Sequence, residues 1–161
     1  MGRNVTMKAR DSVSAKLAEC FVTIGNRRYN FMSMINFEAS FEKQKSEVAI
    51  LGRSGKGNKS TGWKGTFSAT AHYNTSIFRQ MLLDFKNTGE DTYFEIQVTN
   101  EDPTSSAGRQ TMTFIDCNLD GGILSKFDAN SDDPLEEDIN GTFDDFEMPE
   151  SFALLDGMLT N

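Results

Sequence analysis

Two stretches of the chain alternate apolar and polar residues with a period of two. In residues 37–42, Phe and Ala alternate with Glu and Ser, and in residues 67–73, Phe, Ala and Tyr alternate with Ser, Thr and His. This period places apolar side chains on one face of a β-strand and polar side chains on the other. Both stretches therefore predict strands with one buried face and one solvent-exposed face.

Runs rich in β-branched and aromatic residues predict the remaining strands. The first two runs, residues 19–24 and 28–34, are separated by Gly25-Asn26, which is typical of a hairpin turn. The other predicted strands are residues 92–99, 109–119, 123–127 and 139–146.

One amphipathic helix is predicted over residues 75–88. Apolar residues recur there at spacings of three and four, namely Ile77, Phe78, Met81, Leu82 and Phe85. Asn74 or Thr75 can accept hydrogen bonds from the first free N–H groups, and Gly89 suits the left-handed residue that ends a helix.

These elements predict a mostly β protein, a sandwich or barrel of antiparallel strands with one helix packed against it. The pattern contains no repeat and no domain boundary. We therefore expect residues 1–161 to form a single domain, with an N-terminal arm (1–16) and a C-terminal tail (147–161). A chain of this length can bury roughly 70% of its unfolded surface, which is enough for a core without metals or disulfides.

Residues 52–65 interrupt the strand pattern. This segment, GRSGKGNKSTGWKG, holds five glycines and four bases, with Trp63 as its only large apolar residue. Glycine clusters favour irregular backbone, so the segment is predicted to be a long, mobile loop.

Charge is distributed unevenly along the chain. The net charge is −8, but residues 1–126 hold all 16 Lys and Arg, whereas residues 127–161 hold 11 acids and no base. This asymmetry has two interpretations, an acidic tail on a globular body or two complementary surfaces that meet between neighbouring subunits.

Hydropathy and the cysteines indicate the compartment. No apolar run approaches the ~20 residues that cross a bilayer, and the polar N-terminus lacks the apolar stretch of a signal peptide. We therefore expect synthesis in the cytoplasm and no membrane insertion. Cys20 and Cys117 lie in apolar alternating stretches and are predicted to be buried free thiols.

No segment satisfies the requirements of a catalytic, metal or cofactor site. The spacing of Gly52 and Gly57 resembles a phosphate-binding loop, but Asn58 replaces the required lysine. The acidic run from Asp128 starts like a calcium loop, yet Asp133 stands where glycine is needed. His72, the only histidine, is expected on the polar side of its strand. The residues predict a structural or interaction protein, without enzymatic activity, cofactor or metal.

Four stretches resemble the tail tube protein of PBSX-type prophages and contractile phage-tail-like particles. They are EKQKSEVAILGR (42–53), GWKGTFSAT (62–70), FRQMLLDFKNTGEDTYFEIQVTNEDPTSSAGRQT (78–111) and DCNLDGGILSKFD (116–128). The similarity extends over residues 8–149, and the long third stretch is its most specific part.

The resemblance implies a phage tail-tube fold of two packed antiparallel sheets flanked by one α-helix. It also implies six copies to a ring, with rings stacked into a hollow tube inside a contractile sheath. Expected partners are further copies of the chain, the tail sheath protein, the baseplate and tail terminator proteins, and DNA or ions in the lumen. The expected location is the tail of a phage, of a defective prophage or of an R-type bacteriocin-like particle, among which the residues do not discriminate.

The resemblance also suggests where subunits meet. In such proteins a long hairpin loop reaches into the adjacent ring, and the matching segment here is residues 51–65. We expect its bases to meet acids of the next ring, with Trp63 as an anchor. The expected inter-ring residues are Arg53, Lys56, Lys59, Trp63, Lys64, Asp132, Asp133, Glu136, Glu137 and Asp138. The outer face of the helix, with Arg79, Asp84 and Lys86, is expected to be available to a neighbour or to the sheath.

An alternative from a different class is a nucleic-acid-binding module. In that interpretation the basic glycine-rich segment binds phosphates and Trp63 stacks on a base. The net charge of −8 argues against it.

Overall fold

The computed structural model describes residues 5–160. These residues form two compact units, each assembled from segments that alternate along the chain. The first unit comprises residues 5–32, 94–115 and 146–160, and the second comprises residues 33–93 and 116–145. Because the segments interleave, no linker separates the units, and the sequence pattern therefore shows no boundary.

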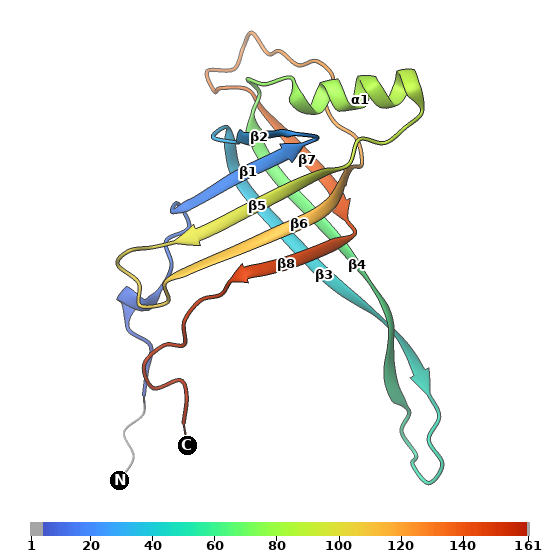
Figure 1. The fold of residues 1–161 in the computed structure, drawn as a ribbon, viewed down its shortest axis with the longest axis vertical. Helices are drawn as coiled ribbons and strands as arrows, with labels where there is room; N and C mark the ends of the chain where they lie inside the picture. The colour runs from blue at the N-terminus through green and yellow to red at the C-terminus, as the bar shows by residue number, and fades with distance from the viewer. Residues whose placement is uncertain (1–4, 161) are drawn as a thin grey trace. The chain divides into compact units, whose positions relative to one another are not determined.

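The first unit is built on antiparallel strands (Figure 1). It contains the short helix η1 (Ala9–Asp11) and the strands β1 (Ala18–Ile24), β2 (Arg27–Asn30), β5 (Phe94–Glu101), the first part of β6 (Arg109–Leu119) and most of β8 (Asp145–Glu150). The strand order is β2-β1-β5-β6, with β8 paired to β6. Val22, Phe94, Ile96 and Phe114 are buried and form its apolar core.

The predicted N-terminal hairpin is present. β1 and β2 pair antiparallel from Phe21↔Asn30 to Ile24↔Arg27, and Gly25 in the connecting turn has a φ of +59°. Only glycine adopts this left-handed conformation at little cost.

The second unit contains β3 (Met34–Val48), β4 (Gly57–His72), α1 (Ile77–Thr88), β7 (Glu136–Phe143) and the last part of β6. Its strand order is β6-β7-β4-β3, and every pairing is antiparallel. One sheet face carries the buried residues Phe67, Ala69, Ala71, Ile139 and Phe143, as the alternating pattern predicts.

Two glycines allow this apolar face to pack closely. A Cβ at Gly141 would lie 2.2 Å from the Asn118 carbonyl oxygen and 2.7 Å from the Phe67 ring. A Cβ at Gly65 would lie 2.4 Å from the Phe143 ring. Neither position has room for a side chain, because heavy atoms cannot approach this closely without a shift of backbone or ring.

The helix is confirmed, with its start two residues later than predicted. Phe78 and Met81 are buried, Gly89 has a φ of +74°, and the Gly89 N–H donates to the Phe85 carbonyl at 2.7 Å. This is the left-handed helix end that the position of the glycine predicted. The fold class, mostly antiparallel β with one α-helix, is also confirmed.

Three local predictions were wrong. Residues 57–65 are not a mobile loop but the first part of β4, and the connection between β3 and β4 is only residues 49–56. Residues 123–127 form no strand, because β5 on one edge and β7 and β8 on the other already pair with β6. The last predicted strand is two strands, β7 and β8, so that the expected C-terminal tail begins as part of a sheet.

Replacement of Gly141 by alanine tests the close packing of the second unit. We expect Gly141→Ala to lower the free energy of unfolding by about 1–3 kcal/mol, because the Asn118 carbonyl must move. Gly55→Ala is the matched control, since its Cβ meets no atom within 4 Å. Urea unfolding followed by circular dichroism measures both variants, and equal stabilities would contradict the packing described.

Candidate functional site

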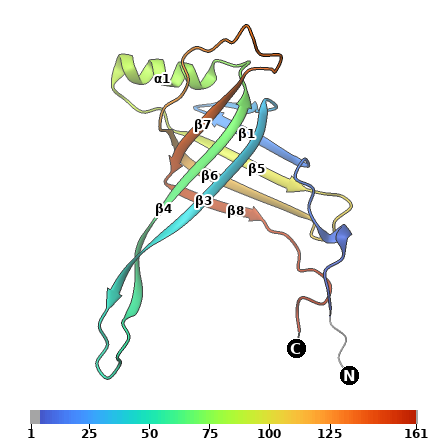
Figure 2. The same cartoon turned by 180° about the vertical axis from the view of Figure 1, so that it is seen from behind.

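A hairpin arm, residues 42–64, extends beyond the rest of the second unit. Pairing of β4 with β7 ends at Gly65↔Phe143, whereas pairing of β4 with β3 continues to Val48↔Gly57. The arm is therefore a two-stranded ribbon, and Figure 2 shows it projecting past the end of β7. Such a ribbon is marginally stable alone in water, so its length suggests a role in contact with another molecule.

Trp63 lies at the root of this arm. Its ring stacks on Phe41 with centroids 4.8 Å apart, and its centroid is 6.1 Å from that of Phe143. Trp63 thus joins the arm to the sheet of its own chain, and its contact with a neighbouring ring stays a prediction.

The arm combines positive charge with an apolar tip. It holds six bases and two acids, and its one close ion pair, between Lys56 and Glu47 at 3.6 Å, is solvent-exposed. At the tip, Leu51 is fully exposed, and Ile50 and Val48 are partly exposed. Arg53 and Lys56 follow in the same connection, so two of the predicted bases lie beside an apolar projection, while Lys59 and Lys64 lie further back along β4.

The opposite end of the second unit is acidic. The connection from β6 to β7 carries Asp128, Asp132 and Asp133, all exposed, and β7 begins with Glu136. Lys126 Nζ donates to the Glu136 carbonyl at 2.9 Å, which fixes this connection beside the strand. Helix α1 lies at the same end, away from the tip of the arm (Figure 1).

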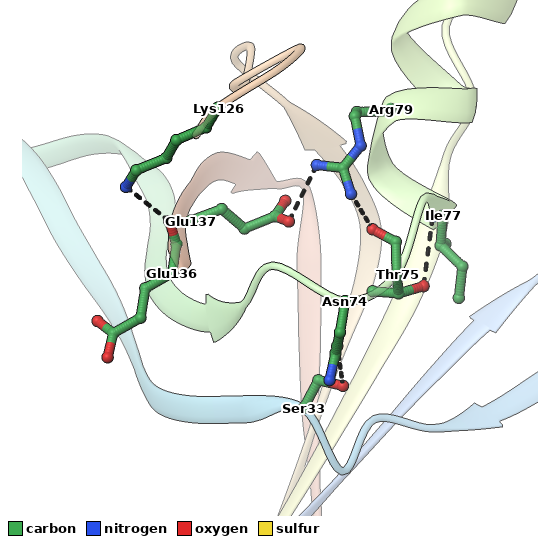
Figure 3. Close-up of polar contacts among 8 residues, drawn as sticks. All are labelled: Ser33, Asn74, Thr75, Ile77, Arg79, Lys126, Glu136 and Glu137. Carbon is green, nitrogen blue, oxygen red and sulfur yellow. Dashed lines mark hydrogen bonds and ion pairs between the residues drawn. The ribbon is translucent and has the colours of Figure 1, made fainter. Parts of the chain in front are cut away.

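Arg79 and Glu137 face each other rather than a neighbour (Figure 3). The Arg79 guanidinium lies 3.0 Å from the Glu137 carboxylate, donates to the Thr75 carbonyl and covers the Tyr73 ring at 4.2 Å. The Glu137 side chain is 4% exposed and that of Arg79 17% exposed. Both were predicted as surface residues for subunit contacts, and this expectation was wrong, because strand alternation turns Glu137 inward and α1 presents Arg79 to it.

The second sheet face of this unit is polar throughout. Alternate residues of β3, β4 and β7 place short polar and acidic side chains on it, and we name this set the polar face: Glu38, Ser40, Thr66, Ser68, Thr70, Asp138, Asn140 and Thr142. Thr70 donates its hydroxyl to Asp138 at 3.1 Å. Lys64 follows on the same face at the end nearest the arm, where it lies opposite Glu42.

Reactive chemistry is not evident in the part of the chain that the structure describes. It contains no group of three or more His, Cys, Asp or Glu residues positioned for a metal, and His72 is exposed on its strand. Both cysteines are free thiols, as predicted, but only Cys117 is fully buried. Cys20 is half-buried, and its burial raises the pKa of the thiol to about 11. No helix within residues 5–160 is long and apolar enough to cross a membrane.

Comparison with known proteins identifies the family. Residues 5–150 match the family described as phage tail tube protein. The chain belongs to the phage tail tube family. It is 36% identical over 149 residues to the phage-like element PBSX protein XkdM of Bacillus subtilis (strain 168), covering 92% of this chain and 98% of that protein.

Two solved structures have a similar fold. A chain in the six-fold symmetrised baseplate of the anti-feeding prophage has a TM-score of 0.61 at 11% identity, covering 92% of this chain and 97% of that one. A chain of the PVC sheath-tube complex, an extracellular contractile injection system, has a TM-score of 0.57 at 13% identity, covering 82% and 88%.

Sequence reasoning missed the apolar tip and the extent of the polar face. Both had a signal in the sequence. The Ser, Thr and Glu positions that alternate with Phe and Ala already share one strand face, and the apolar run before Gly52 precedes a turn. Trp63 drew attention instead because it is the only large apolar residue of the glycine-rich segment.

The ion pair between Arg79 and Glu137 provides a stability test. Glu137→Gln leaves Arg79 without its counter-charge, and we expect a loss of about 3–5 kcal/mol in the free energy of unfolding. The matched control is Glu47→Gln, which breaks the exposed pair with Lys56 and should cost less than about 1 kcal/mol. Equal losses in urea unfolding would contradict the burial described.

Proposed function

We propose that the chain is the structural subunit of the inner tube of a contractile phage tail or R-type bacteriocin-like particle. In this proposal the subunits form hexameric rings that stack around a lumen for DNA or ions. The observation that carries the proposal is that the two ends of the second unit differ in chemistry. The hairpin arm ends in a tip that holds bases and an exposed leucine, whereas the other end of the unit is acidic.

This difference between the two ends of the unit favours head-to-tail association. The β3–β4 hairpin extends over about 50 Å at ~3.3 Å per residue, so the two ends of one unit are far apart. A copy displaced along the hairpin direction places its tip against the acidic end of the next copy. Such a heterologous contact leaves one unused surface at each end, and therefore grows without limit along one axis.

Charge complementarity gives this contact its direction. We propose that Arg53, Lys56, Lys59 and Lys64 of the arm meet the acidic end of a copy in the adjacent ring. On that end the proposed acids are Asp132, Asp133, Glu136 and Asp138. Exposed charges of this kind steer association and reject wrong orientations more than they add affinity, and they are weakened by salt.

A closed ring of six accounts for the exposed sheet edges. Among residues 5–160, β3 has a strand partner on one side only, and so does β2. A 15-residue edge strand is a liability in solution, because its free N–H and C=O groups can pair with other chains. Ring closure covers such edges, and six-fold symmetry belongs to the anti-feeding prophage baseplate to which this fold is similar.

The polar face is the proposed wall of the lumen. It carries Glu38 and Asp138 among hydroxyl and amide groups, and Lys64 at its arm end lies opposite the acid Glu42. Negative charge repels a polyanion, so that DNA passes without adhering. The opposite face of the sheet is apolar and is unsuited to this role.

The outer face of α1 is the proposed contact for the sheath. Asp84 and Lys86 are exposed there, whereas Arg79 is engaged with Glu137. The similar chain of the PVC particle was solved in a sheath-tube complex, which supports a sheath partner for this chain. Baseplate and terminator proteins are the proposed partners at the two ends of the tube.

Removal of the arm charges tests ring stacking. We expect the fourfold variant Arg53→Ser, Lys56→Ser, Lys59→Ser and Lys64→Ser to form no tubes or short ones, because the attraction to the acidic end is lost. The control keeps the charge at the same positions with Arg53→Lys, Lys56→Arg, Lys59→Arg and Lys64→Arg. Tube length is measured by negative-stain microscopy. Tubes of normal length from the serine variant would contradict the proposal that these bases form the contact between rings.

Charge reversal on the polar face tests the lumen. We expect Glu38→Lys with Asp138→Lys to form tubes that retain added DNA, because bases now face the phosphates. The matched control reverses two exposed acids of the first unit, with Glu19→Lys and Asp156→Lys. DNA inside a lumen resists nuclease, so protected DNA should appear with the first variant alone. Equal protection in both variants would refute the assignment of this face.

A further inference from the structure

An apolar hollow lies beside the C-terminal half of α1 in the second unit. Its volume is about 190 Å³, and its apolar lining includes Met81, Leu82, Phe85 and Leu119. Phe85 is 49% exposed although it lies on the same side of the helix as the buried Met81. An aromatic ring that is half exposed at the edge of a hollow is a common feature of contact sites.

Acids surround this hollow. Asp91 and Asp120 belong to its lining, and Asp84 and Glu90 are exposed close by in the chain. Lys86 is the one base in this stretch of α1 and the following turn. The surface therefore suits an apolar side chain that carries positive charge around it.

The tip of the hairpin arm has this chemistry. Leu51 is fully exposed, and Gly52 directly after it has a φ of +85°, which turns the chain at that point. Arg53 and Lys56 follow in the same connection. A cavity of about 150 Å³ accepts a benzene ring, so a hollow of 190 Å³ has room for one leucine side chain.

We infer that Leu51 of one copy inserts into the Phe85 hollow of the next copy. Helix α1, which the hollow adjoins, and the tip of the arm lie at opposite ends of the second unit (Figure 1), so the contact joins two copies. The inference rests on the proposed function and adds the apolar contact that accompanies its charge pairs. The contact would also bury a leucine that is fully exposed in the single chain.

Disulfide trapping between separate chains tests the contact. One preparation carries Leu51→Cys, a second carries Asp91→Cys, and the two are mixed before assembly and oxidation. Cys117 is buried and the raised pKa of Cys20 suppresses its thiolate, so the natural thiols contribute little background. We expect a cross-linked dimer from the mixture, and a ladder of multimers from the double variant.

The control pairs Leu51→Cys with Ser68→Cys, which lies on the polar face and should give no dimer. If the mixture of Leu51→Cys and Asp91→Cys proteins forms tubes but yields no cross-linked dimer on oxidation, the inference is wrong and the proposed function is unaffected. Failure of the unmodified protein to form tubes under any condition would instead overturn the proposed function.

A second measurement does not depend on cysteine. We expect Leu51→Ser to raise the protein concentration needed for tube formation at least tenfold, and Leu51→Met to leave it nearly unchanged. The effect should persist in high salt, because an apolar contact is not screened. If Leu51→Ser leaves the concentration needed for tube formation unchanged, the inference is wrong. Normal tubes from Phe85→Ser would also overturn it, and would indicate that the hollow receives another protein.

Discussion

The antiparallel pairing of β3 with β4 is the interaction on which the second unit depends. The pairing extends from Met34↔Ala71 to Val48↔Gly57, and it supplies both the edge of the sheet and the projecting arm. β7 pairs with the inner part of this hairpin, where Gly65 and Gly141 permit close packing. Arg79 then joins α1 to β7 through Glu137, and Trp63 joins the arm to the sheet through Phe41. One hairpin thus positions every surface that the proposed assembly uses.

Much of the fold was predictable because its signals are local. Period-two alternation located the buried face of β4, the three-and-four spacing located α1, and glycines marked the ends of β1 and α1. Residues 57–65 were mispredicted because their glycines and bases resemble a loop, whereas their strand conformation comes from pairing with residues 41–48. Residues 123–127 have the composition of a strand, but the strand that precedes them, β6, already pairs with β5, β7 and β8. Both errors come from interactions between segments that the local sequence does not encode.

For the candidate surfaces, the sequence predicted which segments carry charge but not which side chains are exposed. Counting acids and bases identified the basic segment and the acidic one, and the structure places them at opposite ends of one unit. The pairing of Arg79 with Glu137 requires a helix and a strand that are distant in sequence to meet, so periodicity alone assigned both residues to the surface. Leu51 was overlooked because its importance comes from its position at the turn of a long hairpin. The proposed assembly combines a salt-sensitive charge contact between rings, an apolar contact at the centre of that charge contact, and a polar face toward the lumen.

The most direct test of this account is a cryo-electron microscopy reconstruction of tubes assembled from the purified chain. The account predicts stacked rings of six around an open lumen, with the polar face of β3, β4 and β7 toward the lumen. It also predicts that each arm tip contacts the α1 end of a copy in the adjacent ring. A reconstruction in which the arms contact only copies within their own ring, or in which the apolar face lines the lumen, would contradict it.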